Sequence, residues 1–248
     1  MTLRADLHSA RPDGRALVQH LHERLARAAD PTKADGMRRY LKSELPCYGV
    51  YTPEMKRIWR EVIPQHPLPD RVSYEATVRV LWDGATHRED RYAALAVTDH
   101  RLYREYQDPA ALPLYDHLVV TGAWWDLVDV VATRRIGRIR RAFPDDLDPV
   151  MRSWADDHDL WRRRAAVICQ VGGKRHTDTG LLVDVLEPNL DRGEFFLRKA
   201  VGWALRDYSW TEPEWVRAYV ADHTARLSPL SRREATRRLA GPSGPASS

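Results

Sequence analysis

The sequence has few of the residues that stabilise small secreted proteins or build metal sites. Cys47 and Cys169 are its two cysteines, and without a CxxC pair they indicate neither a disulfide framework nor a zinc site. We expect both to be reduced side chains that pack in the interior. The ten histidines show no HExxH or other metal-ligand spacing. The sequence therefore predicts no metal, and no nucleotide cofactor is implied either.

Long apolar runs are also missing. No stretch of about 18 apolar residues could span a bilayer, and the first residues, MTLRADLHSARPDG, lack the apolar segment of a signal peptide. We therefore expect a soluble cytoplasmic protein without a membrane partner. The GGK at 172–174 lacks the upstream glycine and the following Ser or Thr of a phosphate-binding P-loop.

The composition favours a folded protein with a moderate preference for anionic partners. The chain has 248 residues, of which 43% are hydrophobic and 30% charged, and it contains nine tryptophans. This combination is typical of a globular protein rather than a disordered one. Lys and Arg exceed Asp and Glu by 39 to 35, and a basic balance favours partners such as nucleic acid without proving one.

The periodicity of apolar residues predicts an all-α protein. Apolar residues recur at spacings of three and four, no segment alternates in the manner of a strand, and Pro, Gly, Asp or Ser separates the segments. The expected helices cover 13–29, 34–45, 53–64, 73–84, 87–106, 110–121, 124–142, 147–157, 159–171, 178–189, 194–208, 212–226 and 230–239. Many short helices with brief connections fit a stack of antiparallel helical pairs. We expect one domain over residues 1–240, followed by a disordered tail at 241–248.

The stretch WWDLVD places indoles and carboxylates on one helix of a basic protein. At about 100° per residue, Trp124 shares an arc with Leu127 and Val131, which is an ordinary core-facing stripe. Trp125 and Asp129 are four residues apart and project together beside that stripe. Two interpretations stay open at this point. Trp125 packs under a neighbouring helix while Asp129 pairs with one of its arginines, or the two serve a binding or catalytic site.

In LWRRRAAV, Arg162 and Arg163 are expected on the polar side, whereas Arg164 falls within the apolar arc. An unpaired buried guanidinium is prohibitive. Arg164 must therefore meet a protein carboxylate or the anionic group of a ligand, and its planar fork suits phosphate. Both alternatives remain open from the residues alone.

The stretch FFLRKAVGWALRDY predicts a basic helix face. Arg198, Lys199 and Arg206 gather around Gly202, which removes a side chain and allows a close backbone approach. Trp203 lies at the border of this face. Cations interleaved with an aromatic residue are typical of a nucleic-acid surface, although such a face also arises on a solvated helix.

Five stretches, in this order and at this spacing, resemble the bacterial AlkD family of alkylpurine DNA glycosylases: LPCYGVYTPEMKRIW, WWDLVD, LWRRRAAV, FFLRKAVGWALRDYS and LSPLSRREA. The resemblance covers roughly residues 31–239. It implies a curved solenoid of HEAT-like repeats whose concave basic face holds duplex DNA. It also implies active-site roles for Trp125, Asp129 and Trp203 and a phosphate-binding role for Arg164.

The resemblance implies hydrolysis of the bond between a cationic N3- or N7-alkylated purine and deoxyribose in double-stranded DNA, without base flipping. Because positive charge grows on the sugar in such a reaction, we expect Asp129 to stabilise it and to hold or activate water, while Trp125 and Trp203 cover the ribose. Arg164, together with the basic face of Arg198, Lys199 and Arg206, is expected to bind phosphates.

No lysine stands out as a Schiff-base nucleophile, so a monofunctional glycosylase that leaves an abasic site is expected. The alternative is a non-catalytic helical-repeat protein that binds DNA or RNA, and a protein-interaction scaffold is a third possibility. No obligate protein partner is implied.

Overall fold

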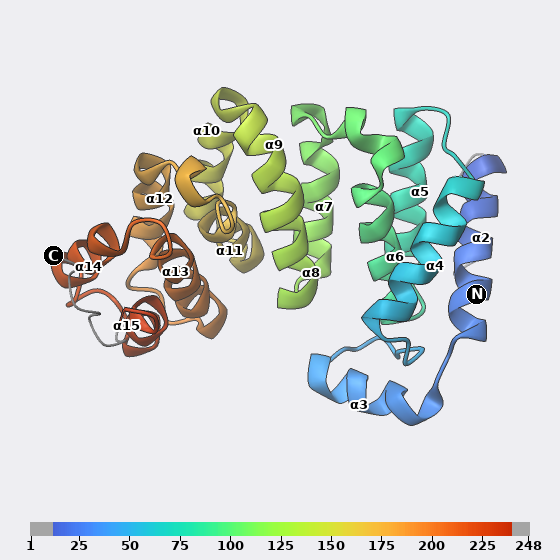
Figure 1. The fold of residues 1–248 in the computed structure, drawn as a ribbon, viewed down its shortest axis with the longest axis horizontal. Coiled ribbons are helices and arrows are strands. Elements are labelled where there is room, and N and C mark those ends of the chain that lie inside the picture. Colours follow the sequence, from blue (N-terminus) through green and yellow to red (C-terminus); the bar gives the residue numbers. More distant parts are fainter. Residues whose placement is uncertain (1–11, 240–248) are drawn as a thin grey trace, which may run out of the picture. The chain divides into compact units, whose positions relative to one another are not determined.

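The computed structural model describes residues 12–239, and these residues form helices and connecting loops without any strand (Figure 1). The tail expected at 241–248 lies outside this range. The contacts of the chain divide it into unit 1, which ends at Leu114, and unit 2, which begins at Tyr115. The all-α class is thus confirmed, whereas the single domain over 1–240 stays a prediction.

The helices of unit 1 are α2 (Pro12–Arg27), α3 (Pro31–Leu41), α4 (Thr52–Val62), α5 (Arg71–Asp83), α6 (Arg88–Asp99) and the start of α7 (Leu112–Gly122), with the short 3-10 helices η1 (Ile63–Gln65), η2 (Arg101–Tyr106) and η3 (Pro109–Ala111). Helix α2 packs against α4 and α5, and α5 packs against α6. Neighbouring helices therefore cover one another, as expected for a stack of helical pairs.

The helices of unit 2 are α8 (Trp125–Val130), the π-helical η4 (Val131–Ile136), α9 (Gly137–Ala142), α10 (Pro144–Ala155), α11 (Leu160–Ile168), α12 (Thr179–Leu186), α13 (Phe195–Tyr208), α14 (Pro213–Asp222) and α15 (Pro229–Thr236), with the 3-10 helices η5 (Lys174–His176) and η6 (Glu187–Asn189). Helix α11 contacts both α8 and α13, and α13 contacts α15. Four elements that carry or support the predicted site residues are thus connected by direct packing.

Each expected helical range contains a helix, but two of the long ranges are not continuous α-helices. The range 87–106 breaks at His100, whose extended backbone ends α6 and whose side chain accepts the Leu102 N–H at the start of η2. The range 124–142 continues through the π-helical turns of η4. Asp108 caps the turn before α7 by accepting the Ala110 N–H at 3.0 Å. By contrast, α4 begins after Tyr51 without a side-chain cap.

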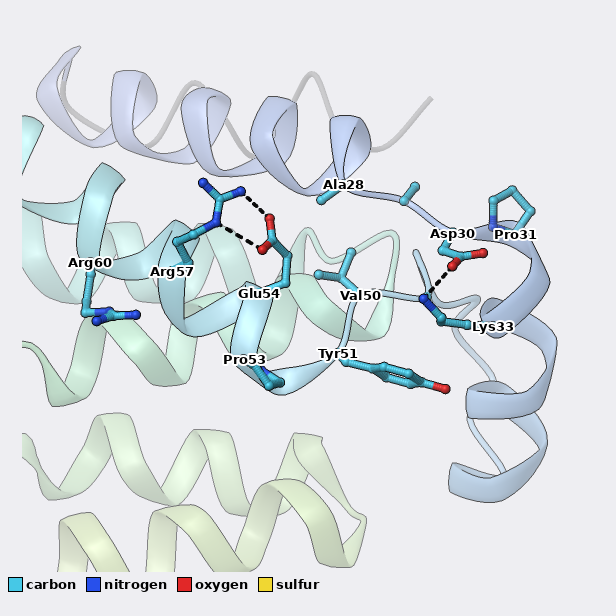
Figure 2. A pocket seen from close by; sticks show the side chains of 12 residues that line it. Ala28, Asp30, Pro31, Lys33, Val50, Tyr51, Pro53, Glu54, Arg57 and Arg60 are labelled. Carbon is cyan, nitrogen blue, oxygen red and sulfur yellow. Dashed lines mark hydrogen bonds and ion pairs between the residues drawn. The ribbon is translucent and has the colours of Figure 1, made fainter.

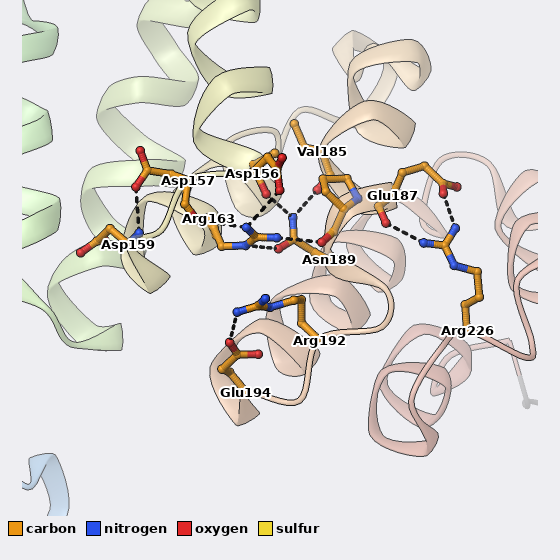
Figure 3. A network of polar contacts seen from close by, with 12 residues as sticks. Asp156, Asp157, Asp159, Arg163, Val185, Glu187, Asn189, Arg192, Glu194 and Arg226 are labelled. Carbon is orange, nitrogen blue, oxygen red and sulfur yellow. Dashed lines mark hydrogen bonds and ion pairs between the residues drawn. The ribbon is translucent and has the colours of Figure 1, made fainter.

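The expectation that Arg163 lies on the polar side of its helix is wrong, because its side chain is buried. Its Nε donates to Asn189 Oδ1 at 2.9 Å, and its Nη atoms donate to the carbonyl oxygens of Asp157 and Pro188 at 3.0 and 2.8 Å. The amide of Asn189 in turn donates to the Val185 carbonyl at 2.8 Å (Figure 3) and to the Ala155 carbonyl at 2.9 Å. The last carbonyls of a helix lack intrahelical partners. Arg163 is therefore buried because carbonyl oxygens just after α10 and within η6 need hydrogen-bond donors.

Helices α13 and α15 approach each other closely at Gly202. A Cβ atom at this position would lie 2.5 Å from Glu234 Cβ and 2.8 Å from the Ser231 carbonyl oxygen. Ser231 Oγ also donates to the Arg198 carbonyl at 2.9 Å. The close approach expected from Gly202 is thus a helix–helix contact, and it fixes α15 against the basic face of α13.

Candidate active site

Asp129 and Arg164 form a bidentate ion pair between α8 and α11. Arg164 Nε donates to Asp129 Oδ1 at 2.7 Å, and Nη2 donates to Oδ2 at 2.8 Å. The guanidinium side chain is 6% exposed and the carboxylate side chain 17% exposed. Of the alternatives open for Arg164, the protein carboxylate is the partner found, and the carboxylate is the more accessible end of the pair.

A second helix holds the far side of the Arg164 guanidinium. Nη1 donates to the Phe196 carbonyl at the start of α13, at 2.6 Å, and the guanidinium carbon lies 5.9 Å from the centre of the Phe196 ring. Phe196 packs with Trp124 and Trp161, with ring centres 5.1 Å from each. Trp124 thus packs in an aromatic cluster, in agreement with its expected core-facing position, and this cluster contacts the ion pair through Phe196.

Two opposed effects act on the acidity of Asp129. Burial raises the pKa of its carboxyl group, while the hydrogen bonds and positive charge of Arg164 lower it, and the nearby Asp126 raises it slightly. Burial is the larger effect, so the pKa of Asp129 lies above the ordinary value of 3.8. The Asp129 carboxyl group is therefore largely shielded from water, and Arg164 holds it in one orientation.

The two predicted active-site tryptophans lie on helices that both touch α11. Trp125 begins α8 one turn before Asp129, and Trp203 lies in the middle of α13 next to Gly202. Both indoles are half-buried. The helix that carries Arg164 thus packs against both tryptophan-bearing helices, α8 with Trp125 and α13 with Trp203.

The basic residues of α13 have different environments. Lys199 Nζ contacts Glu234 Oε2 at 2.8 Å, and Arg206 Nη1 contacts Glu234 Oε1. Arg198 forms no ion pair within residues 12–239, and its Nε is buried without a hydrogen-bond partner there. The reasoning from sequence missed Glu234, although it lies in the LSPLSRREA stretch that carried part of the resemblance.

A separate pocket of about 750 Å³ lies in unit 1 between the starts of α3 and α4. Four of its charged side chains form two ion pairs: Lys33 Nζ contacts Asp30 Oδ2 at 2.6 Å, and Arg57 pairs with Glu54 (Figure 2). Tyr51 lies beneath the Lys33 ammonium, 5.2 Å away. None of the predicted site residues lines this pocket.

Residues 12–239 contain no group of three or more His, Cys, Asp or Glu side chains placed to hold a metal ion. In the same part of the chain, no helix is both long and apolar enough to cross a membrane. Cys47 and Cys169 are both buried and form no disulfide, and burial raises the pKa of the Cys169 thiol to about 12. The Cys169 thiol is therefore not a ready nucleophile at neutral pH.

The protein is thus an all-α protein in which the packing of α11 against α8 and α13 brings the Asp129–Arg164 ion pair together with two helices that each carry a tryptophan. A family model described as DNA alkylation repair enzyme matches residues 21–239. The chain belongs to the DNA alkylation repair enzyme family, which confirms the resemblance found in the motifs.

The fold is similar to a solved structure described as a predicted DNA alkylation repair enzyme from Enterococcus faecalis. The two chains share 25% sequence identity with a TM-score of 0.78, and the match covers 86% of this chain and 97% of that one. A search of curated proteins found no match. Family membership implies a DNA substrate.

Proposed function

We propose that the protein is a DNA glycosylase that hydrolyses the N-glycosidic bond of cationic N3- or N7-alkylated purines in duplex DNA and leaves an abasic site. The observation that carries the proposal is the Asp129 carboxylate, which Arg164 holds in a fixed orientation beside Trp125. A carboxylate repels DNA phosphates at close range, so its presence in such a site is best explained by a positive charge that it meets during the reaction. The sugar that forms as the base departs supplies that charge.

In this mechanism the alkylated base leaves as a neutral purine, because it is already cationic. The electrons of the breaking bond go to the base, positive charge develops on the sugar ring, and water then attacks the anomeric carbon and loses a proton. Asp129 stabilises the positive sugar and orients or deprotonates the water. Trp125 and Trp203 cover the ribose and exclude other water molecules.

Arg164 acts in this proposal first as the residue that orients Asp129. Its Nε and two Nη atoms each donate one hydrogen bond within the protein, so two of its five N–H groups remain for a phosphate. The phosphate contact predicted from the family resemblance stays a prediction. Arg198, Lys199 and Arg206 are the more exposed candidates for the DNA backbone.

Incubation with duplex DNA that contains 7-methylguanine tests the proposal. We expect released 7-methylguanine and abasic sites in otherwise intact strands, because no lysine is assigned as a Schiff-base nucleophile. Strands that are cleaved without alkali treatment would instead indicate lyase activity. Tight binding of the methylated duplex without base release would contradict glycosylase activity and favour a non-catalytic nucleic-acid-binding protein.

A further inference from the structure

Glu234 joins two cations of α13 that are separated by two helical turns. Its Oε2 atom contacts Lys199 Nζ at 2.8 Å, and its Oε1 atom contacts Arg206 Nη1. The Glu234 side chain is only 10% exposed, whereas the side chains of Lys199 and Arg206 are 39% and 28% exposed. The carboxylate thus lies beneath the two cations, which keep contact with solvent.

The fold places Glu234 there through Gly202, which lies between the two cations on the same face of α13. With no Cβ at Gly202, the Glu234 backbone of α15 comes close enough for its short side chain to reach both turns. A buried carboxylate is unfavourable unless it is paired. The pairing therefore fixes the carboxylate and both cations together.

Positive charge remains in excess around this carboxylate. Burial, followed by the charges of Arg206 and Arg237, lowers the pKa of Lys199, and Arg164 and Arg233 add to the effect. An ammonium has three N–H donors and a guanidinium five, and Glu234 uses one from each side chain. The other donors of Lys199 and Arg206 stay available to an anion outside.

We propose that Glu234 is a positioning residue that holds Lys199 and Arg206 as one binding unit for the phosphodiester backbone of duplex DNA. The inference rests on the proposed function, since that function supplies DNA as the ligand. Two long cationic side chains lose conformational freedom when they bind a phosphate, and prior fixation by Glu234 removes much of that loss. Simple electrostatics predicts the opposite, because Glu234 is an anion beside the phosphate.

The sign of the effect of Glu234→Gln on the affinity for undamaged duplex, measured by fluorescence anisotropy at low salt, separates these views. The amide keeps the shape but no longer holds the two cations, so we expect binding about five- to tenfold weaker despite one added positive charge. Glu214→Gln is the matched control, because it changes the net charge equally at a side chain that is 82% exposed and pairs only with Arg217 in the described residues. It should leave affinity unchanged or slightly tighter. Unchanged or tighter binding by Glu234→Gln would overturn the proposal.

A double-variant cycle removes the ambiguity of a folding defect. In the Lys199→Ala/Arg206→Ala background, Glu234→Gln should have no further effect on affinity, and a further loss there would mean that Glu234 acts only by supporting α15. If Glu234→Gln does not fold, Glu234→Asp provides the test instead. Its shorter side chain keeps the charge but cannot reach both cations, so this variant should also bind duplex DNA more weakly. Wild-type affinity for this variant would contradict the proposal. Release of 7-methylguanine by the wild type, measured separately, tests the glycosylase activity itself.

Discussion

The most informative perturbation is Asp129→Asn, because the structure contains a matched ion pair elsewhere in unit 2. Arg140 Nε and Nη2 donate to Asp148 at 2.6 and 2.9 Å, and Nη1 donates to Gln170 Oε1 at 2.8 Å. The two side chains of this pair are 5% and 13% exposed. Arg140 Nη2 also lies 3.5 Å from Asp178 Oδ2. Asp148→Asn therefore reproduces the charge change, bidentate geometry and burial of Asp129→Asn at a position without a proposed catalytic role, with Asp178 as one additional, more distant anion.

Both substitutions should destabilise the fold by a similar amount. Loss of one partner of a buried ion pair costs about 3–5 kcal/mol, and the lower end applies because the asparagine oxygen still accepts one N–H. A loss of about 3 kcal/mol corresponds to a decrease in Tm of roughly 6–12 °C for a chain of this size. Thermal unfolding followed by circular dichroism measures this value for each variant.

Excision should separate the two variants. The Asp129→Asn protein lacks the negative charge that faces the sugar, so we expect base release to fall on the order of 10²–10³-fold, as for removal of one electrostatic group from an active site. The Asp148→Asn protein should retain wild-type excision per folded molecule. Single-turnover release of 7-methylguanine below the Tm of both variants provides the comparison. Equal losses in the two variants, or none in either, would refute the role of Asp129.

The other predictions concern the residues around this site. Arg164→Ala should lower both Tm and excision, since Asp129 loses its orientation; a lower Tm with unchanged excision per folded molecule would make Arg164 purely structural. Excision should fall as the pH falls through the pKa of Asp129, and because burial raises that pKa, a rate–pH profile should show the loss starting above the pH expected for an ordinary aspartate. Gly202→Ala should destabilise the protein by about 1–3 kcal/mol through the clash with Glu234, whereas Gly36→Ala in α3, where a Cβ meets nothing within 4 Å, should be neutral or stabilising in the same melting assay.

Sequence reasoning succeeded where one helix determines the answer. Apolar periodicity located the helices, and the position of Arg164 within an apolar arc correctly required an anionic partner. The choice between a carboxylate and a ligand could not be made, because it depends on how α8 lies against α11. The position of Arg163 was wrong for a related reason: helical phase does not reveal that the ends of neighbouring helices present carbonyl oxygens without donors.

Glu234 illustrates the same limit for the basic face. The residues around Gly202 predicted a close approach, but the approaching group could have been a nucleic-acid backbone or another helix. The stretch TRRIGRIRRAF at 133–143 is rich in arginine, and its sequence alone does not distinguish phosphate contacts from solvated charge. Arg140 of this stretch is instead buried against Asp148, so counting cations in the sequence overestimates the charge available to DNA.

In the proposed function, the pairing of Asp129 with Arg164 also explains how a surface that binds DNA can contain a carboxylate. At a distance the two charges nearly cancel, so an approaching phosphate meets little net repulsion from the pair. At contact distance the charges act separately, and the carboxylate is the more exposed of the two, at 17% against 6%. A positive sugar in contact with the pair is therefore closer to the anion than to the cation. This arrangement favours the developing charge of the reaction while limiting the penalty for binding DNA before it.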